Sequence, residues 1–486
     1  MLHDGNVRGD ARAPSTGDVC TRDTRAPPTG PLHKTMALDP GTFRPRAKCV
    51  AARVVSGAND ADVARYDVDA RSRARAIAPR DASLAWTPRE PPPRTRARRF
   101  SMDVTRREVS RAREVKLGDR WGVRVAVVCQ EGWYPRKEDH VNQDTWVVVA
   151  RDGLTHREES IDEFGSDAVS ERSCGELLLG VFDGHGKHGE ACATIAGGAF
   201  AEFLKRETRG ISTGTGGYER TFERVNATVC DSLGDDASFS GSTAITALFD
   251  SRGTVRVGNV GDSRAVVGVE VGPGQTPRNR HTKKWEVRDL TRDQTCFRAD
   301  ERKRMRVEAQ SAMTFATIGM VLGETESHED FGDGEPGSED EYCDDPPRVF
   351  MAGQRFPGCA FTRSIGDTVG KSLGVSATPE MSTYDLAEEP STRCLILASD
   401  GVFEFMSSAE TMAIAEKFYD ENAPEAAELA AHAIVRAAYT RWQENDERAD
   451  DITAVVAFIY PADPGTSTAT VVVNDVIEAT MNKLAI

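Results

Sequence analysis

Runs of apolar residues separated by polar turns begin at Trp121 and continue almost to the end of the chain. Leu177–Phe182 is a continuous apolar run, as expected of a strand that is buried on both faces. Shorter runs bounded by turn residues predict further strands. These are Val123–Val128, Thr145–Ala150, Thr243–Phe249, Thr254–Val260, Ser263–Val269, Leu395–Ser399 and Ile452–Tyr460.

Between these strands, apolar residues recur at helical spacing. The predicted helices are Glu190–Arg206, Tyr218–Leu233, Asp300–Gln310, Ser408–Tyr419 and Ala423–Trp442. Strands outnumber helices, and hairpins and paired helices are interleaved along the chain. This order favours the α+β class with packed antiparallel sheets.

The N-terminal region, residues 1–115, lacks sustained apolar periodicity and is rich in Arg, Ala, Pro and Asp. Such a composition favours disorder over a packed core. A plastid transit peptide is the alternative, because Arg outnumbers Lys, but the early acidic residues Asp4, Asp10, Asp18 and Asp23 argue against it. We therefore expect a protein of the cytoplasm or nucleus.

Polar segments also interrupt and follow the predicted domain, which spans residues 120–462. Residues 151–175 have the composition of a surface loop. Residues 324–348 hold 11 acidic residues in 25 positions, which favours a solvated acidic loop. A docking site for basic substrates or partners is the alternative use of that loop. Residues 463–486 are expected to form a C-terminal tail.

The net charge of −16 is unevenly distributed. Residues 1–100 carry 19 basic and 11 acidic residues, which leaves 42 basic and 66 acidic residues for the rest. A body this acidic repels nucleic acid, so nucleic acid is excluded as a partner.

No apolar run reaches the roughly 18 residues of a membrane-spanning helix. The ten cysteines show no metal-ligand spacing, which indicates reduced thiols, several of them buried.

Aspartates follow or precede several of the predicted apolar strands. Asp183 and Asp400 each end a strand and are followed by glycine, Asp450 precedes a third strand, and Asp144 opens a fourth. Carboxylates at strand ends are held rigidly and can converge at one rim of a sheet. Hard cations such as Mg²⁺ and Mn²⁺ choose oxygen ligands of this kind. One Asp-Gly step is a common turn, but two after buried strands are hard to explain as turns alone.

The segment Leu178–Gly186, which contains Asp183, resembles the signature of the metal-dependent type 2C protein phosphatases, the PPM family. The resemblance continues in chain order over roughly residues 120–462. The motifs that carry it are Gly241–Ala244, Gly258–Ala265, Leu290–Gln294, Asp300–Arg302, Phe361–Asp367, Ala398–Glu404 and Asp450–Ala454. Asn142–Asp144, Leu290–Gln294 and Ala360–Asp367 most resemble plant-type members.

The resemblance implies a central sandwich of two antiparallel β-sheets flanked by helices, with two Mn²⁺ or Mg²⁺ ions in a cleft at one end. It also implies hydrolysis of phosphoserine and phosphothreonine in proteins by a metal-activated water, without a phosphoenzyme. The implied metal ligands are Asp144, Asp183, the Gly184 carbonyl, Asp400 and Asp450, with Asp183 bridging the ions. His185 is the implied general acid.

Asp262 corresponds to a family position that can hold a third metal, although a plain turn is nearly as good an explanation there. Many members have Glu-Asp where this chain has Gln143 and Asp144, so one carboxylate ligand is missing. Asp144 can replace it directly or through a water.

The phosphate-binding position falls on His140. The alternative is that His140 is only a surface-loop residue, because a neutral histidine is a poorer phosphate clamp than lysine. Asp451 stands where many members have asparagine.

Two other functions remain open at this point. A phosphatase-like pseudoenzyme would recognise partners without turnover, and the changes at Gln143 and His140 are its support. A calcium-binding or structural acidic protein lacks any ligand loop of the EF-hand type. The favoured hypothesis is a monomeric enzyme that acts on phosphorylated proteins, without nucleic acid or membrane as a partner. Within the sheet, Arg264 and Arg363 are expected to be structural.

Overall fold

The computed structural model describes residues 107–135, 140–152, 174–206, 215–323, 330–332 and 345–462. Most of the predicted disordered N-terminal region, most of the loop 151–175 and the C-terminal tail therefore lie outside the described residues. Residues 107–115, however, belong to a strand, β1 (Arg107–Leu117), which pairs with β2 (Trp121–Gln130). The expected disorder is wrong for these residues, because Val115 and Leu117 are buried in the core.

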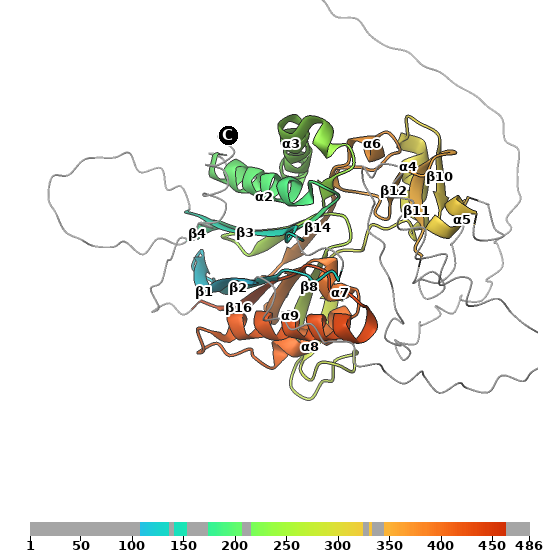
Figure 1. The fold of residues 1–486 in the computed structure, drawn as a ribbon. Helices are drawn as coiled ribbons and strands as arrows, with labels where there is room; N and C mark the ends of the chain where they lie inside the picture. Colours follow the sequence, from blue (N-terminus) through green and yellow to red (C-terminus); the bar gives the residue numbers. More distant parts are fainter. Residues whose placement is uncertain are drawn as a thin grey trace, which may run out of the picture. The chain divides into compact units, whose positions relative to one another are not determined.

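Two layers of antiparallel strands form the centre of the domain (Figure 1). The first layer runs β14 (Glu380–Asp385), β7 (Thr254–Val260), β6 (Ala244–Asp250), β4 (Cys174–His185) and β3 (Asp144–Asp152). The second runs β1, β2, β16 (Ile452–Pro461), β15 (Thr392–Ala398), β8 (Arg264–Glu270) and β9 (Trp285–Asp289). Among the described residues, the layers are joined where Leu117 of β1 meets Cys174 of β4.

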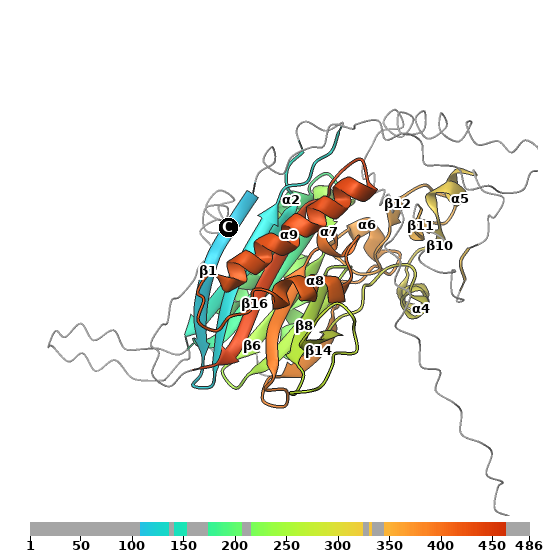
Figure 2. The ribbon, with the colours of Figure 1, turned by 90° about the horizontal axis from the view of Figure 1, so that it is seen from below.

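Helices cover the outer face of each layer. Helices α2 (Gly189–Arg206) and α3 (Thr215–Leu233) pack on the first layer, and α8 (Ser408–Glu416) and α9 (Ala426–Asn445) pack on the second (Figure 1). Figure 2 shows α8 and α9 lying across β16 and β8. Both faces of the central strands are therefore buried, which explains why their sequences are continuous apolar runs.

A smaller sheet consists of β10 (Met313–Ala316), β11 (Arg348–Met351) and β12 (Pro357–Cys359), and Figure 2 shows it grouped with α4 (Ala299–Glu308) and α5 (Ile318–Leu322). The acidic segment 324–348 lies mostly outside the described residues. Its last residues do not belong to a solvated loop. Arg348 is buried in β11, and the Asp345 carboxylate accepts hydrogen bonds from the first two backbone amides of α5.

The predicted strands and helices are all present, with ends displaced by a few residues. The missed elements are short or partly exposed, so their apolar patterns are weak. Besides the smaller sheet, β1, β9 and β14, they are β5 (Gly241–Ser242), β13 (Ile365–Gly366), α5, α6 (Thr368–Lys371), α7 (Asp400–Phe403) and the 3₁₀ helix η2 (Gly234–Ala237). The predicted α+β sandwich with flanking helices is confirmed.

Within the described part of the chain, no helix is both long and apolar enough to span a bilayer. Six cysteines in that part have free thiols, and five of them are buried. They are Cys129, Cys192, Cys296, Cys359 and Cys394, with Cys230 partly exposed. The expectation that several cysteines serve as small buried residues is confirmed for this set.

Candidate metal centre and active site

Asp144 and Asp183 face each other across the β3–β4 pair. They are register partners at the end of the antiparallel ladder, and their exposed fractions are 7% and 2%. Side chains of directly opposed residues lie on the same face of a sheet, with Cβ atoms about 5 Å apart. The structure therefore brings together two aspartates that the sequence separates by nearly 40 positions.

Asp400 and Asp450 reach the same rim from the second layer. Strand β15 ends at Ala398, two residues before Asp400, and Ala398 pairs with Ala454 of β16. Because these strands are antiparallel, the end of β15 and the start of β16 lie side by side. A Cβ on Gly401 would lie 2.0 Å from the Asp451 carbonyl oxygen, so only glycine permits this approach.

Ser399 joins the two layers at this rim. Its hydroxyl donates a hydrogen bond of 2.8 Å to Oδ2 of Asp144 and accepts one of 3.1 Å from the Thr453 amide. Asp144 is thereby held against the turn that carries Asp400. This side chain had no role in the sequence interpretation, and its position immediately before the strand-end aspartate was the available signal.

Asp450 is anchored by a residue that the sequence also left without a role. The Tyr134 hydroxyl donates a hydrogen bond of 2.7 Å to Oδ1 of Asp450, and the Asp451 amide donates one of 2.9 Å to the same oxygen. Asp450 is 1% exposed. A buried carboxylate held by two donors has a fixed orientation, as a metal ligand requires.

Asp262 lies in the turn before β8, and Arg264 of β8 pairs with Ala398 of β15, so this turn reaches the rim that carries the other aspartates. Two hydroxyls connect it to the first layer. The Oγ atoms of Thr243 and Ser263 are 2.8 Å apart, and the Asp183 amide donates to Thr243 Oγ1 at 3.0 Å. The possible third-metal role of Asp262 stays a prediction.

Gln143 links the segment before β3 to the loop that follows Asp183. Its side-chain amide donates to the Gly186 carbonyl at 2.8 Å, and its own carbonyl accepts from the Gly184 amide at 3.0 Å. A Cβ on Gly184 would lie 2.2 Å from the Gly189 carbonyl oxygen. The loop that follows Asp183 is therefore fixed by Gln143, Gly184 and Gly186.

His140 contacts a carboxylate in this structure, and its role as a phosphate contact stays a prediction. Its Nε2 lies 2.9 Å from Oδ1 of Asp451, a fully buried residue. The other carboxylate oxygen of Asp451 accepts from the Gln143 amide at 2.8 Å, and Oδ1 also accepts from the Gly132 amide at 2.7 Å. Asp451 thus organises the segment before Asp144, which explains why a side chain with two acceptor oxygens is useful at this position.

His185 is nearly buried beside Asp367. Its Nε2 lies 2.7 Å from Oδ2 of Asp367, and its ring packs against Phe361 with the ring centroids 4.3 Å apart. Burial on its own raises the pKa of Asp367, but the charge and hydrogen bond of His185 outweigh it, so the pKa lies below its usual value. The sequence interpretation placed Asp367 in a family motif but assigned it no function.

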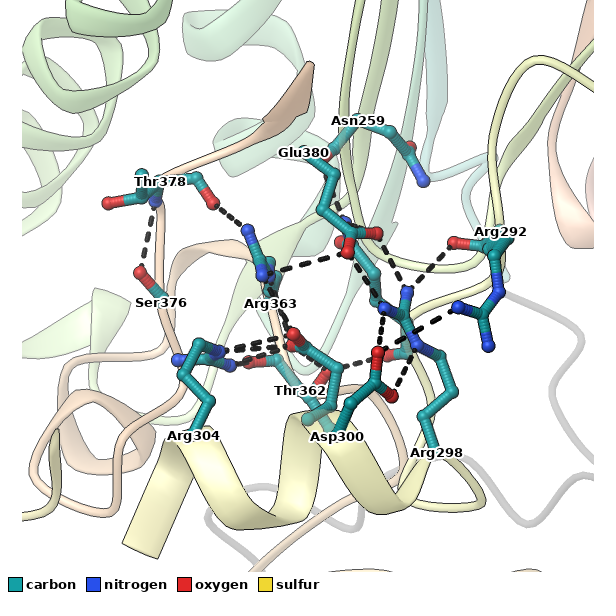
Figure 3. A network of polar contacts seen from close by, with 12 residues as sticks. Asn259, Arg292, Arg298, Asp300, Arg304, Thr362, Arg363, Ser376, Thr378 and Glu380 are labelled. Carbon is teal, nitrogen blue, oxygen red and sulfur yellow. Dashed lines mark hydrogen bonds and ion pairs between the residues drawn. The ribbon is translucent and has the colours of Figure 1, made fainter. Parts of the chain in front are cut away.

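Arg363 and Arg264 both pair with carboxylates, but only Arg264 lies in the sheet that was predicted to hold both, because Arg363 lies between β12 and β13. Arg363 donates two hydrogen bonds to the Glu301 carboxylate, of 2.7 and 3.0 Å, within the polar network around α4 (Figure 3). Burial by itself raises the pKa of Glu301, but hydrogen bonds from Arg363 and Arg304 outweigh it and hold the pKa well below the usual range. Arg264 forms a matching pair with Asp293, at 2.6 and 3.0 Å.

The oxygen-rich rim fits a hard divalent cation better than a soft one, because all four strand-end side chains are carboxylates. In the parts of the chain that the structure describes, no three His, Cys, Asp or Glu side chains are already grouped as a metal cage. Mg²⁺ does not require such a cage, since it keeps several waters and is bound through one or two carboxylates. The donor chemistry therefore fits a hydrated Mg²⁺ or Mn²⁺.

Comparisons with known proteins agree with this chemistry. The family model "Protein phosphatase 2C" matches residues 144–446. "Probable protein phosphatase 2C 35" of Arabidopsis thaliana is 34% identical over 334 residues, which cover 69% of this chain and 83% of that protein. "Probable protein phosphatase 2C 72" of the same plant is 27% identical over 294 residues, 58% of this chain and 76% of that protein.

Among solved structures, a serine-threonine phosphatase 2C from Toxoplasma gondii matches with a TM-score of 0.44 and 18% identity. The match covers 72% of this chain and 99% of that one. A similarity at this level adds nothing to the assignment, which the family model and the plant relatives carry. The chain belongs to the protein phosphatase 2C family, as a plant-type member.

Proposed function

We propose that this protein hydrolyses phosphoserine and phosphothreonine in other proteins, with two Mn²⁺ or Mg²⁺ ions bound at the aspartate rim. The observation that carries the proposal is the convergence of Asp144 and Asp183 from one sheet with Asp400 and Asp450 from the other. A structural turn at any one of these positions needs no such convergence.

Asp183 would hold both ions and the Gly184 carbonyl one of them. Asp144, Asp400 and Asp450 would complete the ligand sets. Asp262 would serve a third ion if one binds. When bound, the ions supply Lewis acidity and a water of lowered pKa. The chain itself contributes the rigidity of the site, because Ser399 fixes the orientation of Asp144 through a hydrogen bond.

His185 would act as the general acid that protonates the departing serine or threonine oxygen. It follows Asp183 by two residues at the end of β4, so it lies next to the proposed metal ligands. Its ring is nearly buried and packed on Phe361, which limits the orientations that it can adopt. A fixed donor next to the leaving group is what general acid catalysis requires.

A pseudoenzyme that binds phosphoproteins without turnover is the second candidate. The neutral Gln143, whose amide is engaged with Gly186, is the observation that favours it. Both candidates predict phosphoprotein partners. We further propose that the protein acts as a monomer in the cytoplasm or nucleus, without nucleic acid or membrane as a partner.

Phosphate release from a phosphothreonine peptide distinguishes the two candidates. Protein stripped with EDTA should be inactive and should recover with millimolar Mn²⁺. Mn²⁺ binding is measured on the same sample by isothermal titration calorimetry. Mn²⁺ binding without phosphate release would support the pseudoenzyme, whereas release that persists in EDTA would remove the metal from the proposal.

A further inference from the structure

The His185 ring is held by a side chain far away in sequence. Nε2 of His185 lies 2.7 Å from Oδ2 of Asp367, and the two side chains are 4% and 3% exposed. The close contact with the Phe361 ring further restricts rotation of the imidazole. Asp367 comes from the segment between β13 and α6, so it belongs to none of the strands that form the proposed metal rim.

Asp367 is itself fixed by several contacts. Ser364 Oγ donates to the same Oδ2 atom at 2.6 Å, and the Asp367 amide donates to the Ser240 carbonyl at 3.0 Å. Lys371 Nζ donates to the Ser364 carbonyl at 2.6 Å, which adds a positive charge near the pair. These contacts leave the carboxylate little freedom to turn away from the His185 ring.

The backbone around Asp367 is also adapted to this placement. Asp367 has φ = 50°, in the left-handed region that residues other than glycine rarely occupy. Gly241 lies against it, and a Cβ there would be 2.2 Å from Oδ2 of Asp367. Unfavourable backbone conformations persist where the surrounding structure imposes them, and they concentrate at functional sites.

A carboxylate bound to one imidazole nitrogen places a proton on that nitrogen and fixes the plane of the ring. With Nε2 facing Asp367, Nδ1 is the ring atom left for the substrate. We propose that Asp367 is a positioning residue: it holds the Nε2–H group of His185 and so orients the ring with Nδ1 towards the substrate, where the Nδ1 proton passes to the leaving oxygen while Nε2 keeps its own. This inference rests on the proposed phosphatase function.

The test compares Asp367→Asn with wild type in the full-length protein loaded with Mn²⁺. Asparagine adopts the left-handed conformation nearly as readily as aspartate, so the backbone is preserved. We expect kcat on a phosphothreonine peptide to fall about tenfold or more, within the range of general acid catalysis. On an aryl phosphate, whose leaving group needs little protonation, kcat should change less than about twofold.

Two further variants make the result specific. In a His185→Ala background, Asp367→Asn should cause no additional loss on the peptide, because its effect passes through the ring. Asp250→Asn is the matched control, because Asp250 is also buried and ion-paired. It lies at the end of β6 that is remote from the aspartate rim. It should affect both substrates alike. The proposal would be overturned if Asp367→Asn lost equal activity on both substrates or hydrolysed the peptide faster than wild type. A further loss from Asp367→Asn in the His185→Ala background would also overturn it.

The proposal has a second readout that does not need turnover. In protein labelled with ¹⁵N-histidine, the His185 signals are identified by their absence from the His185→Ala spectrum. Wild type should show a proton on Nε2, and Asp367→Asn should show a changed or mixed tautomer. If wild type releases no phosphate, the proposed function fails. The spectrum still shows whether Asp367 determines which nitrogen of the His185 ring carries the proton. A wild-type proton on Nδ1 alone, or an unchanged spectrum in Asp367→Asn, would reject the positioning role.

Discussion

Replacing Glu301 with glutamine tests how strongly α4 is tied to the segment that leads to Asp367. Glu301 is 2% exposed and accepts hydrogen bonds from both nitrogens of the Arg363 fork, from Arg304 and from the Thr362 hydroxyl. These contacts lie within the polar network drawn in Figure 3. The substitution keeps the shape of the side chain but removes the charge that the buried Arg363 and the partly buried Arg304 face.

The size of the loss follows from burial. Removing one partner of a buried ion pair costs about 3–5 kcal/mol, because the remaining charge is left without compensation. Glutamine retains one acceptor oxygen for Arg363 or Thr362, so we expect the lower end, about 3 kcal/mol. The free energy of unfolding is measured by urea titration followed by circular dichroism.

Glu389→Gln is the matched control. Glu389 pairs with Arg288 at 2.8 Å, but their side chains are 39% and 44% exposed. Exposed pairs of this kind contribute about 0–1 kcal/mol. If Glu301→Gln lowers the free energy of unfolding no more than this control does, burial does not strengthen the Glu301–Arg363 pair.

The pH dependence of Glu301→Gln has a definite sign. The folded pKa of Glu301 lies below the unfolded value, although burial alone raises it, because hydrogen bonds from Arg363 and Arg304 dominate. The stabilisation is therefore complete above the unfolded pKa, about 4.3, and declines as the pH falls below it. The difference between wild type and variant should shrink between pH 5 and more acidic conditions. A difference that stays constant or grows over that range contradicts this assignment.

Three further changes test the rim itself. Tyr134→Phe removes a hydroxyl that holds a proposed metal ligand, so Mn²⁺ affinity measured by calorimetry should fall about tenfold with the fold intact; unchanged affinity would make this contact irrelevant to the metal. Gln143→Glu removes the amide donor to the Gly186 carbonyl and should cost about 1–3 kcal/mol in urea unfolding, whereas a stabilised variant contradicts the structural role. Gly401→Ala places a Cβ 2.0 Å from the Asp451 carbonyl oxygen and should lower the melting temperature and Mn²⁺ affinity together.

The sequence predicted the layered core and the position of the rim aspartates because both leave local patterns. Leu177–Phe182 is apolar throughout because β4 is covered on both faces, and Asp183 is conspicuous because it ends that run. A residue that directly follows an apolar strand can therefore be assigned to the rim of a sheet from the sequence alone.

Contacts between distant segments leave no such pattern. Nothing near Tyr134 in the sequence indicates that its hydroxyl meets Asp450, which lies more than 300 positions later. The contact between His140 and Asp451 joins residues that are equally far apart in the sequence, so no local pattern indicated it. Short elements such as β13 were missed for the same reason, because tertiary pairing stabilises them and local preference does not.

The proposed function requires that the aspartate rim hold the metal ions on which phosphate release depends. Phosphate release from a phosphothreonine peptide in millimolar Mn²⁺, compared between wild type, Asp183→Asn and the remote Asp250→Asn, tests it most directly. Wild type and Asp250→Asn should release phosphate, and Asp183→Asn should release none. Turnover by Asp183→Asn at the wild-type rate, or none by wild type, would contradict it.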